Sequence, residues 1–190
     1  MLLGSLGTGV TLVPMSPMLG ASEVSRLLAI AQPRLVVTND QLLPVLTQAV
    51  AMAGCQHTIE IVTVTDSSSS SAVPLAQYCD NDARGYDDRP TFDLDTTLGI
   101  LPFSSGTTGL PKGVMLSHTN LTSAIALTNN EQSGCAYGPW SPDTESQRSM
   151  LSVIPMFHIF GLTMNVLQPL TGGHHMIIMP KFEPKSFIDK

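Results

Sequence analysis

Apolar residues recur along this chain with two periods, one typical of helices and one typical of strands. Val24, Leu27 and Leu28 are spaced as on one face of a helix that begins near Ser22. Segment 59–65 alternates and is rich in β-branched residues, as a strand is. The pattern predicts strands at 10–15, 35–38, 59–65, 98–103, 114–116, 150–155 and 176–179. It predicts helices at 22–31, from 44 to 50–52, after Ser117 and at 159–170.

The alternation of strands with helices predicts an α/β fold with a largely parallel sheet. Three polar segments, 67–71, 80–95 and 133–146, are rich in turn-forming residues and are expected to be surface loops. The 190 residues are enough for one sizeable domain with a core of its own. No internal repeat is visible, and the length of residues 1–190 suits a single domain.

The composition narrows the classes of partner and compartment. Nine basic and fifteen acidic side chains give a net charge of −6 without a basic run, which argues against nucleic acid as a partner. Only 13% of residues are charged, whereas soluble domains have about 25%. This low fraction is expected for the interior part of a larger protein or for a small apolar protein. Cys55, Cys79 and Cys135 are widely spaced, which fits a reducing, intracellular compartment. No apolar run reaches the ~18 residues of a membrane span, so no transmembrane segment is expected.

The densest polar chemistry lies in residues 104–113. Four hydroxyl side chains, three glycines and one lysine share this segment. Glycines let backbone N–H groups approach an anion, hydroxyls add donors or reach a metal, and a lysine supplies a mobile positive charge. The pattern favours a loop that holds the polyphosphate of ATP over a flexible linker, which has no need of Pro111 and Lys112. It is not a Walker loop, because Gly113 follows Lys112 where that loop has Ser or Thr.

Residues 103–121 closely resemble the signature of the adenylate-forming superfamily. This superfamily includes acyl-CoA synthetases, coumarate–CoA ligases, firefly-type luciferases and peptide-synthetase adenylation domains. Segment 154–161, with Pro155 and His158, resembles the family's Pro-x-Phe-His segment, and 9–17 and 32–38 give a weaker match. The resemblance implies a part of the large N-terminal AMP-binding domain, nearest to acyl-CoA synthetases of the coumarate–CoA ligase type.

The resemblance implies ATP-dependent activation of a carboxylic acid. The acid attacks the α-phosphate, pyrophosphate leaves, and a thiol, often that of CoA, displaces AMP. Lys112 would pair with an outer phosphate and His158 would lie near the acyl carboxylate and the thiol path, which makes these two the candidate catalytic residues. Thr108 is the candidate contact to the Mg²⁺ of ATP. The candidate phosphate-binding residues are Ser104, Ser105, Gly106, Thr107, Thr108, Gly109 and Lys112.

Structural roles are the alternatives for the histidines. His158 could instead be a buried structural histidine. His118, at an expected helix start, is expected to have a structural or capping role. His174 and His175 are adjacent, and strand alternation directs them to opposite faces, so they are not expected to form a metal pair.

Several segments of the family are not found before Lys190: the Tyr-Gly-x-Thr-Glu adenine loop, the ribose aspartate, the interdomain hinge and the lysine of the C-terminal lid. The chain is therefore expected to be an internal portion of the N-terminal domain, inactive alone, with the remainder of a parent chain as partner. Two other readings stay open: an adenylation domain serving a carrier-protein thiol, and a non-catalytic nucleotide-binding or interaction fragment. Cytoplasm and peroxisome are the expected compartments.

Overall fold

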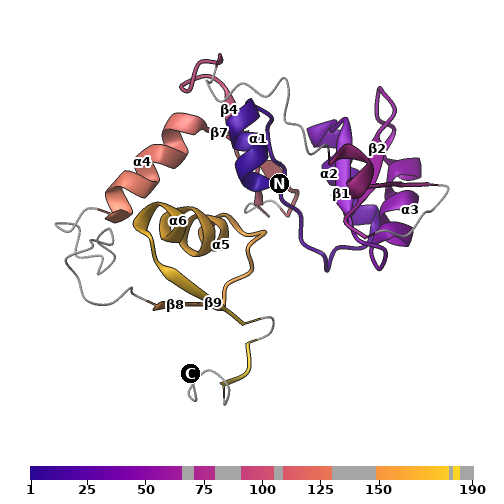
Figure 1. Cartoon of the computed structure of the whole chain (residues 1–190). Coiled ribbons are helices and arrows are strands. Elements are labelled where there is room, and N and C mark those ends of the chain that lie inside the picture. The colour runs from indigo at the N-terminus through magenta and orange to yellow at the C-terminus, as the bar shows by residue number, and fades with distance from the viewer. Residues whose placement is uncertain (66–70, 80–90, 105–108, 130–148, 180–181, 185–190) are drawn as a thin grey trace. The chain divides into compact units, whose positions relative to one another are not determined.

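The computed structural model describes residues 1–65, 71–79, 91–104, 109–129, 149–179 and 182–184, and its chain forms two compact units. The first, called here the sheet unit, contains residues 15–91 and 103–114. The second, called the helical unit, contains residues 1–14, 92–102 and 115–190. Figure 1 shows the elements of both units along the chain.

The sheet unit is built around three parallel strands. Strands β1 (Leu35–Thr38), β2 (Glu60–Thr63) and β3 (Val73–Pro74) pair in that order. Helices α2 (Ala21–Ala31) and α3 (Leu43–Ala53) pack against each other, and a short 3₁₀ helix, η1 (Leu75–Tyr78), follows β3. Because β1 and β2 run parallel, α3 forms the crossover between them, as in a βαβ unit (Figure 1).

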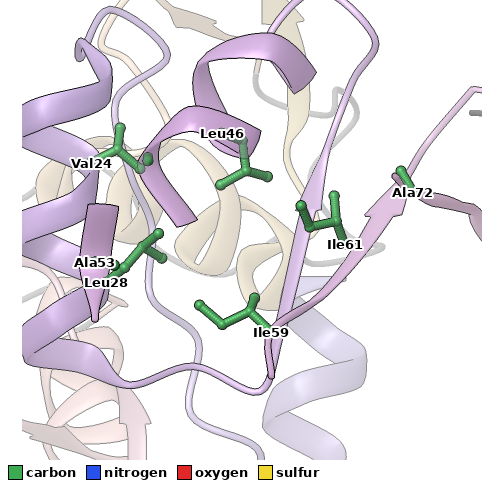
Figure 2. Close-up of a cluster of buried hydrophobic side chains, with 8 residues drawn as sticks. Val24, Leu28, Leu46, Ala53, Ile59, Ile61 and Ala72 are labelled. Atoms are coloured by element: carbon green, nitrogen blue, oxygen red, sulfur yellow. The ribbon is translucent and has the colours of Figure 1, made fainter. Parts of the chain in front are cut away.

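The core of this unit lies among the two helices and β2. Val24 and Leu28, one helical turn apart, both face inward, and Leu28 is fully buried. Figure 2 shows these side chains converging with residues of α3 and of the β2 region. The buried cluster consists of Val24, Leu28, Leu46, Ala49, Ala53, Ile59, Ile61 and Ala72.

The helical unit combines two strand pairs with a set of helices. Strand β4 (Leu98–Ile100) pairs antiparallel with β7 (Leu116–Ser117), and helices α1 (Leu2–Thr8) and α4 (His118–Asn129) belong to the same unit. Strands β8 (Ser149–Ser152) and β9 (His175–Ile178) pair in parallel.

A helical connection joins β8 to β9. It consists of α5 (Ile159–Leu162), a π-helical turn η3 (Thr163–Leu167) and α6 (Gln168–Gly172). The buried core of the unit is formed by Ile100, Leu121, Leu162 and Leu167, with Leu2, Leu6 and Leu12 among the partly buried residues packed on it.

The predicted α/β class is confirmed, since parallel strands alternate with helices in the β1–α3–β2 and β8–β9 connections. The single strand predicted at 98–103 is wrong: it divides into β4 and β5 (Phe103–Ser104). Pro102 stands between them, and proline has no N–H to continue a ladder. The strand predicted at 10–15 contributes only a bridge from Leu12 to Ile100.

Other boundaries also differ from the predictions. The strand predicted at 114–116 lies at Leu116–Ser117, and helix α1 was not predicted. The helix predicted at 159–170 is present through Gly172, with the π turn in its middle. Within the described residues, no helix has both the length and the apolar character needed to cross a membrane.

Candidate functional site

The candidate phosphate-binding segment begins and ends in two short paired strands of the sheet unit. Strands β5 and β6 (Lys112–Gly113) pair antiparallel, with Phe103 opposite Gly113 and Ser104 opposite Lys112. Directly opposed residues of an antiparallel pair point to the same face, with their Cβ atoms about 5 Å apart. The Ser104 and Lys112 side chains therefore leave the strand pair on the same face, and both residues are exposed.

The turn that leads into β6 depends on glycine and proline. Gly109 has a φ of +75°, in the left-handed region that side chains disfavour. A Cβ atom there would meet no atom within 4 Å, so the backbone conformation and not a lack of space requires glycine. Pro111 then restricts φ immediately before Lys112. Of the predicted phosphate-binding residues, Ser105, Gly106, Thr107 and Thr108 lie outside the described residues.

His158 lies in the helical unit, at the residue that caps the N-terminus of α5. Its backbone is extended, with φ −82° and ψ 139°, and its Nδ1 accepts a hydrogen bond from the Phe160 amide at 3.2 Å. The residue is exposed, so the alternative of a buried structural histidine is wrong. Because Nδ1 is an acceptor, the hydrogen-bond network assigns the proton of the neutral ring to Nε2. This edge can donate a hydrogen bond to a ligand.

His118 has the structural role predicted for it. It is buried at the start of α4, its ring lies 4.9 Å from that of Phe92, and its Nε2 has no hydrogen-bond partner within the described part of the chain. The cap itself is formed by Ser117 and Asn120. The Ser117 amide donates to Asn120 Oδ1 at 3.0 Å, and the Asn120 amide donates to Ser117 Oγ at 3.3 Å. The Ser-x-x-Asn spacing is the signal that identifies this reciprocal cap.

The remaining histidines differ in exposure. His174 is buried and His175 is exposed, in agreement with their predicted opposite orientation. His175 Nδ1 lies 3.3 Å from Ser149 Oγ across the β8–β9 pair. Within the described ranges, no group of three or more His, Cys, Asp or Glu side chains is arranged to hold a metal ion.

Two ionisable groups of the described residues have shifted pKa values. The hydroxyl of Tyr78 donates to Glu60, and this hydrogen bond is the main cause that raises the pKa of Tyr78. The Asp95 amide, at 2.9 Å, and the Thr96 hydroxyl, at 3.0 Å, donate to Asp93 and lower its pKa. Neither group belongs to the hairpin or to the His158 segment. The Asp93 shift arises within a local turn, whereas the Tyr78 shift arises from a contact between η1 and β2.

The sequence profile of AMP-binding enzymes matches residues 1–189 of this chain. The chain belongs to the AMP-binding enzyme family. The profile match includes both the Ser104–Lys112 hairpin and the His158 segment. The predicted membership of the adenylate-forming superfamily is thereby confirmed.

Two relatives show that this chain is similar to CoA ligases. Probable 4-coumarate–CoA ligase 3 of Dictyostelium discoideum is 35% identical over 132 residues, which cover 68% of this chain and 22% of that protein. The long-chain-fatty-acid–CoA ligase of Bacillus subtilis is 38% identical over 96 residues, which cover 50% of this chain and 16% of that protein. The matched region is thus about a fifth of the length of such relatives.

The fold of this AMP-binding chain is also found among solved structures. The luciferase-like enzyme of the nonluminescent mealworm Zophobas morio superposes with a TM-score of 0.78 and 22% identity. The match covers 99% of this chain and 40% of that one. At this identity the likeness supports the fold alone.

Proposed function

We propose that this chain supplies the phosphate-binding loop and part of the acyl pocket of an ATP-dependent acid–thiol ligase. The observation that carries the proposal is the pairing of Ser104 with Lys112 at the base of a glycine- and hydroxyl-rich loop in an AMP-binding chain. A hydroxyl donor and an ammonium on one face of a hairpin form a preorganised site for an anion. The relatives' names, CoA ligases for 4-coumarate and long-chain fatty acids, favour CoA over a carrier-protein thiol.

In the proposed reaction, a carboxylate oxygen of the acid attacks the α-phosphorus of ATP. The bond to the bridging oxygen breaks, and pyrophosphate leaves with the electron pair. Lys112, Ser104 and residues 105–109 hold the β- and γ-phosphates, so their donors face the charge that develops on the leaving group. The Mg²⁺ that accompanies ATP shares this charge, and Thr108 is its proposed contact.

The second proposed step forms the thioester. The CoA thiol loses its proton, its sulfur attacks the acyl carbonyl, the bond from that carbon to the phosphate oxygen breaks, and AMP leaves with the electron pair. We assign His158 to the acyl side of this chemistry, since its ring is exposed next to the N-terminus of α5 and its Nε2 has no hydrogen-bond partner among the described residues. An intracellular location is part of the proposal because ATP and CoA are metabolites of the cell interior; a peroxisomal location has no support.

The phosphate assignment can be tested by titrating the ¹⁵N-labelled chain with Mg–ATP and with Mg–AMP. We expect ATP to shift the amide signals of Gly109, Lys112 and Gly113, and AMP to shift them much less, because AMP lacks the β- and γ-phosphates. Lys112→Ala should weaken the response, whereas Arg26→Ala, which removes an exposed positive charge from α2 of the same unit, should not. Equal responses to ATP and AMP, or none, would contradict the proposal.

A further inference from the structure

The turn before α5 lies directly against the helix that it enters. A Cβ atom at Gly161 would be 2.2 Å from the Pro155 carbonyl oxygen, 2.9 Å from its carbonyl carbon and 3.1 Å from the Ile154 carbonyl oxygen. All three are backbone atoms, which a side-chain movement cannot displace. The segment that leads to His158 therefore approaches α5 as closely as a residue without a side chain allows.

A buried polar side chain holds the start of the same segment. Asn165 is 9% exposed, and its Nδ2 donates a hydrogen bond to the Ile154 carbonyl oxygen at 3.1 Å. A buried amide is costly unless it is hydrogen-bonded, so an asparagine in this apolar helix is explained by its partner. The contact joins residues eleven positions apart, from the helix back to the turn.

The π turn allows Asn165 to reach Ile154 without loss of the core. Leu162 and Leu167 are both buried in the core of the helical unit, although they are five residues apart. In an α-helix residues three or four apart share a face, whereas π-helical hydrogen bonding joins residues five apart. The wider turn thus keeps both leucines in the core while Asn165 lies between them in sequence. Such turns frequently occur at functional sites.

Hydrogen bonds of the backbone connect the Asn165–Ile154 contact to the imidazole of His158. The His158 amide donates to the Pro155 carbonyl at 3.1 Å, and the Leu162 amide donates to the His158 carbonyl at 2.8 Å. The His158 ring is then fixed by the Phe160 amide. The Ile154 carbonyl accepts the hydrogen bond from Asn165, and Ile154 directly precedes Pro155, whose carbonyl accepts from the His158 amide.

We propose that Asn165 is a positioning residue for His158: it fixes the Ile154 carbonyl, and the 155–158 turn and Gly161 transmit that position to the imidazole. The functional meaning of this role rests on the proposed assignment of His158 to acyl and thiol chemistry. The structural link itself can be tested without any activity.

The test is ¹⁵N NMR of the His158 ring and of the Phe160 amide in the full chain. Asn165→Asp keeps the shape of the side chain but removes its donor, so we expect the Nδ1 signal to move and the Phe160 amide to exchange about fivefold to tenfold faster. Thr163→Val is the matched control, since it removes another side-chain hydrogen bond of the same turn, from Thr163 Oγ1 to the Ile159 carbonyl at 2.8 Å. The control should leave the His158 ring signals unchanged. Unchanged His158 and Phe160 signals in folded Asn165→Asp would overturn the proposal.

A measurement on the unsubstituted chain covers the case in which Asn165→Asp does not fold. The Asn165 side-chain amide and the Phe160 backbone amide should exchange with solvent through the same opening. A Phe160 amide that exchanges while the Asn165 amide stays protected would overturn the link.

Thioester formation separates this proposal from the proposed function. In an enzyme of full family length that carries this segment, His158→Ala should slow thioester formation, and Asn165→Asp should add little in that background. If His158→Ala has no kinetic effect while the NMR link is present, the function of His158 is wrong and the positioning by Asn165 stands. If the two substitutions slow the reaction independently, Asn165 does not act through His158.

Discussion

Lys112 is the single charge on which the proposed phosphate site most depends. A charge-assisted hydrogen bond is worth about 1.5–3 kcal/mol, so Lys112→Ala should weaken Mg–ATP binding by roughly 10- to 100-fold. In an enzyme of full family length that carries this segment, the same change should raise the ATP requirement and slow adenylate formation. Lys112→Arg, which keeps the charge, should recover part of the affinity. Calorimetry with Mg–ATP measures the effect, and an unchanged affinity in Lys112→Ala would contradict the role.

Gly109 offers a residue-scale test that separates backbone strain from ligand binding. Gly109 and Gly54 have φ values of +75° and +60°, and neither would place a Cβ within 4 Å of another atom. Substitution by alanine at either position should cost about 1–2 kcal/mol in the free energy of unfolding, because both enter the left-handed region. Only Gly109→Ala should also weaken Mg–ATP binding. Urea unfolding and calorimetry compare the two, and an equal loss of affinity would show that general destabilisation is responsible.

Individual residues mark the limit of what the pattern could predict. His118 was predicted to be structural because it opens a helix, and its burial agrees. The sequence predicts no role for Asn165, because its side chain donates a hydrogen bond to the Ile154 carbonyl. That residue belongs to another segment, and no periodicity connects the two. Tertiary hydrogen bonds of this kind leave no local signal in a sequence.

At the scale of elements, glycine-to-alanine substitutions should have opposite signs in α1 and α5. Gly4, inside α1, would place its Cβ in open space, so Gly4→Ala should stabilise the helix by about 0.5–1 kcal/mol. Gly161→Ala meets the Pro155 carbonyl and should destabilise the chain by about 1–3 kcal/mol, as overpacking does. Thermal unfolding followed by circular dichroism gives both signs. A stabilising Gly161→Ala would mean that the turn is not held against α5.

The same scale distinguishes the two faces of α2. Leu28 is fully buried in the cluster of Figure 2, whereas Ile30 on the same helix is 51% exposed. Leu28→Ala should lower the free energy of unfolding by about 2–5 kcal/mol through the lost burial and the cavity. Ile30→Ala should change it by less than about 0.5 kcal/mol. Urea unfolding of the two variants is the measurement, and similar losses would contradict the assigned core.

The elements that the sequence predicted best are those specified by local pattern. β1 occupies the predicted 35–38, since an apolar, β-branched run follows Gln32, whose left-handed φ of 46° ends α2, and Pro33. The predicted strand at 98–103 failed because Pro102 divides a run whose hydropathy is continuous. The hairpin pairing of Ser104 with Lys112 could not be read from the pattern, since register is set by pairing across the loop.

At the scale of the whole molecule, the β5–β6 hairpin interrupts the chain path of the helical unit. Residues 103–114 belong to the sheet unit, but the segments on both sides, 92–102 and 115–190, belong to the helical unit. The strands that flank the hairpin, β4 and β7, pair with each other. Residues 1–190 are expected from the sequence to belong to one domain, and this stays a prediction; the two compact units are defined by which segments contact one another.

The last prediction separates nucleotide binding from catalysis for the chain as a whole. The alignment of this chain spans 22% of the Dictyostelium ligase. The adenine, ribose and lid-lysine segments of the family are not found in the 190 residues. We therefore expect the 190 residues to bind Mg–ATP through the hairpin but to give no ATP–pyrophosphate exchange with any carboxylic acid. Exchange with radiolabelled pyrophosphate is the assay, with a complete 4-coumarate–CoA ligase as the positive control. Measurable exchange would show that these residues contain a full catalytic set, whereas an absence of both binding and exchange would remove the phosphate role from residues 104–113.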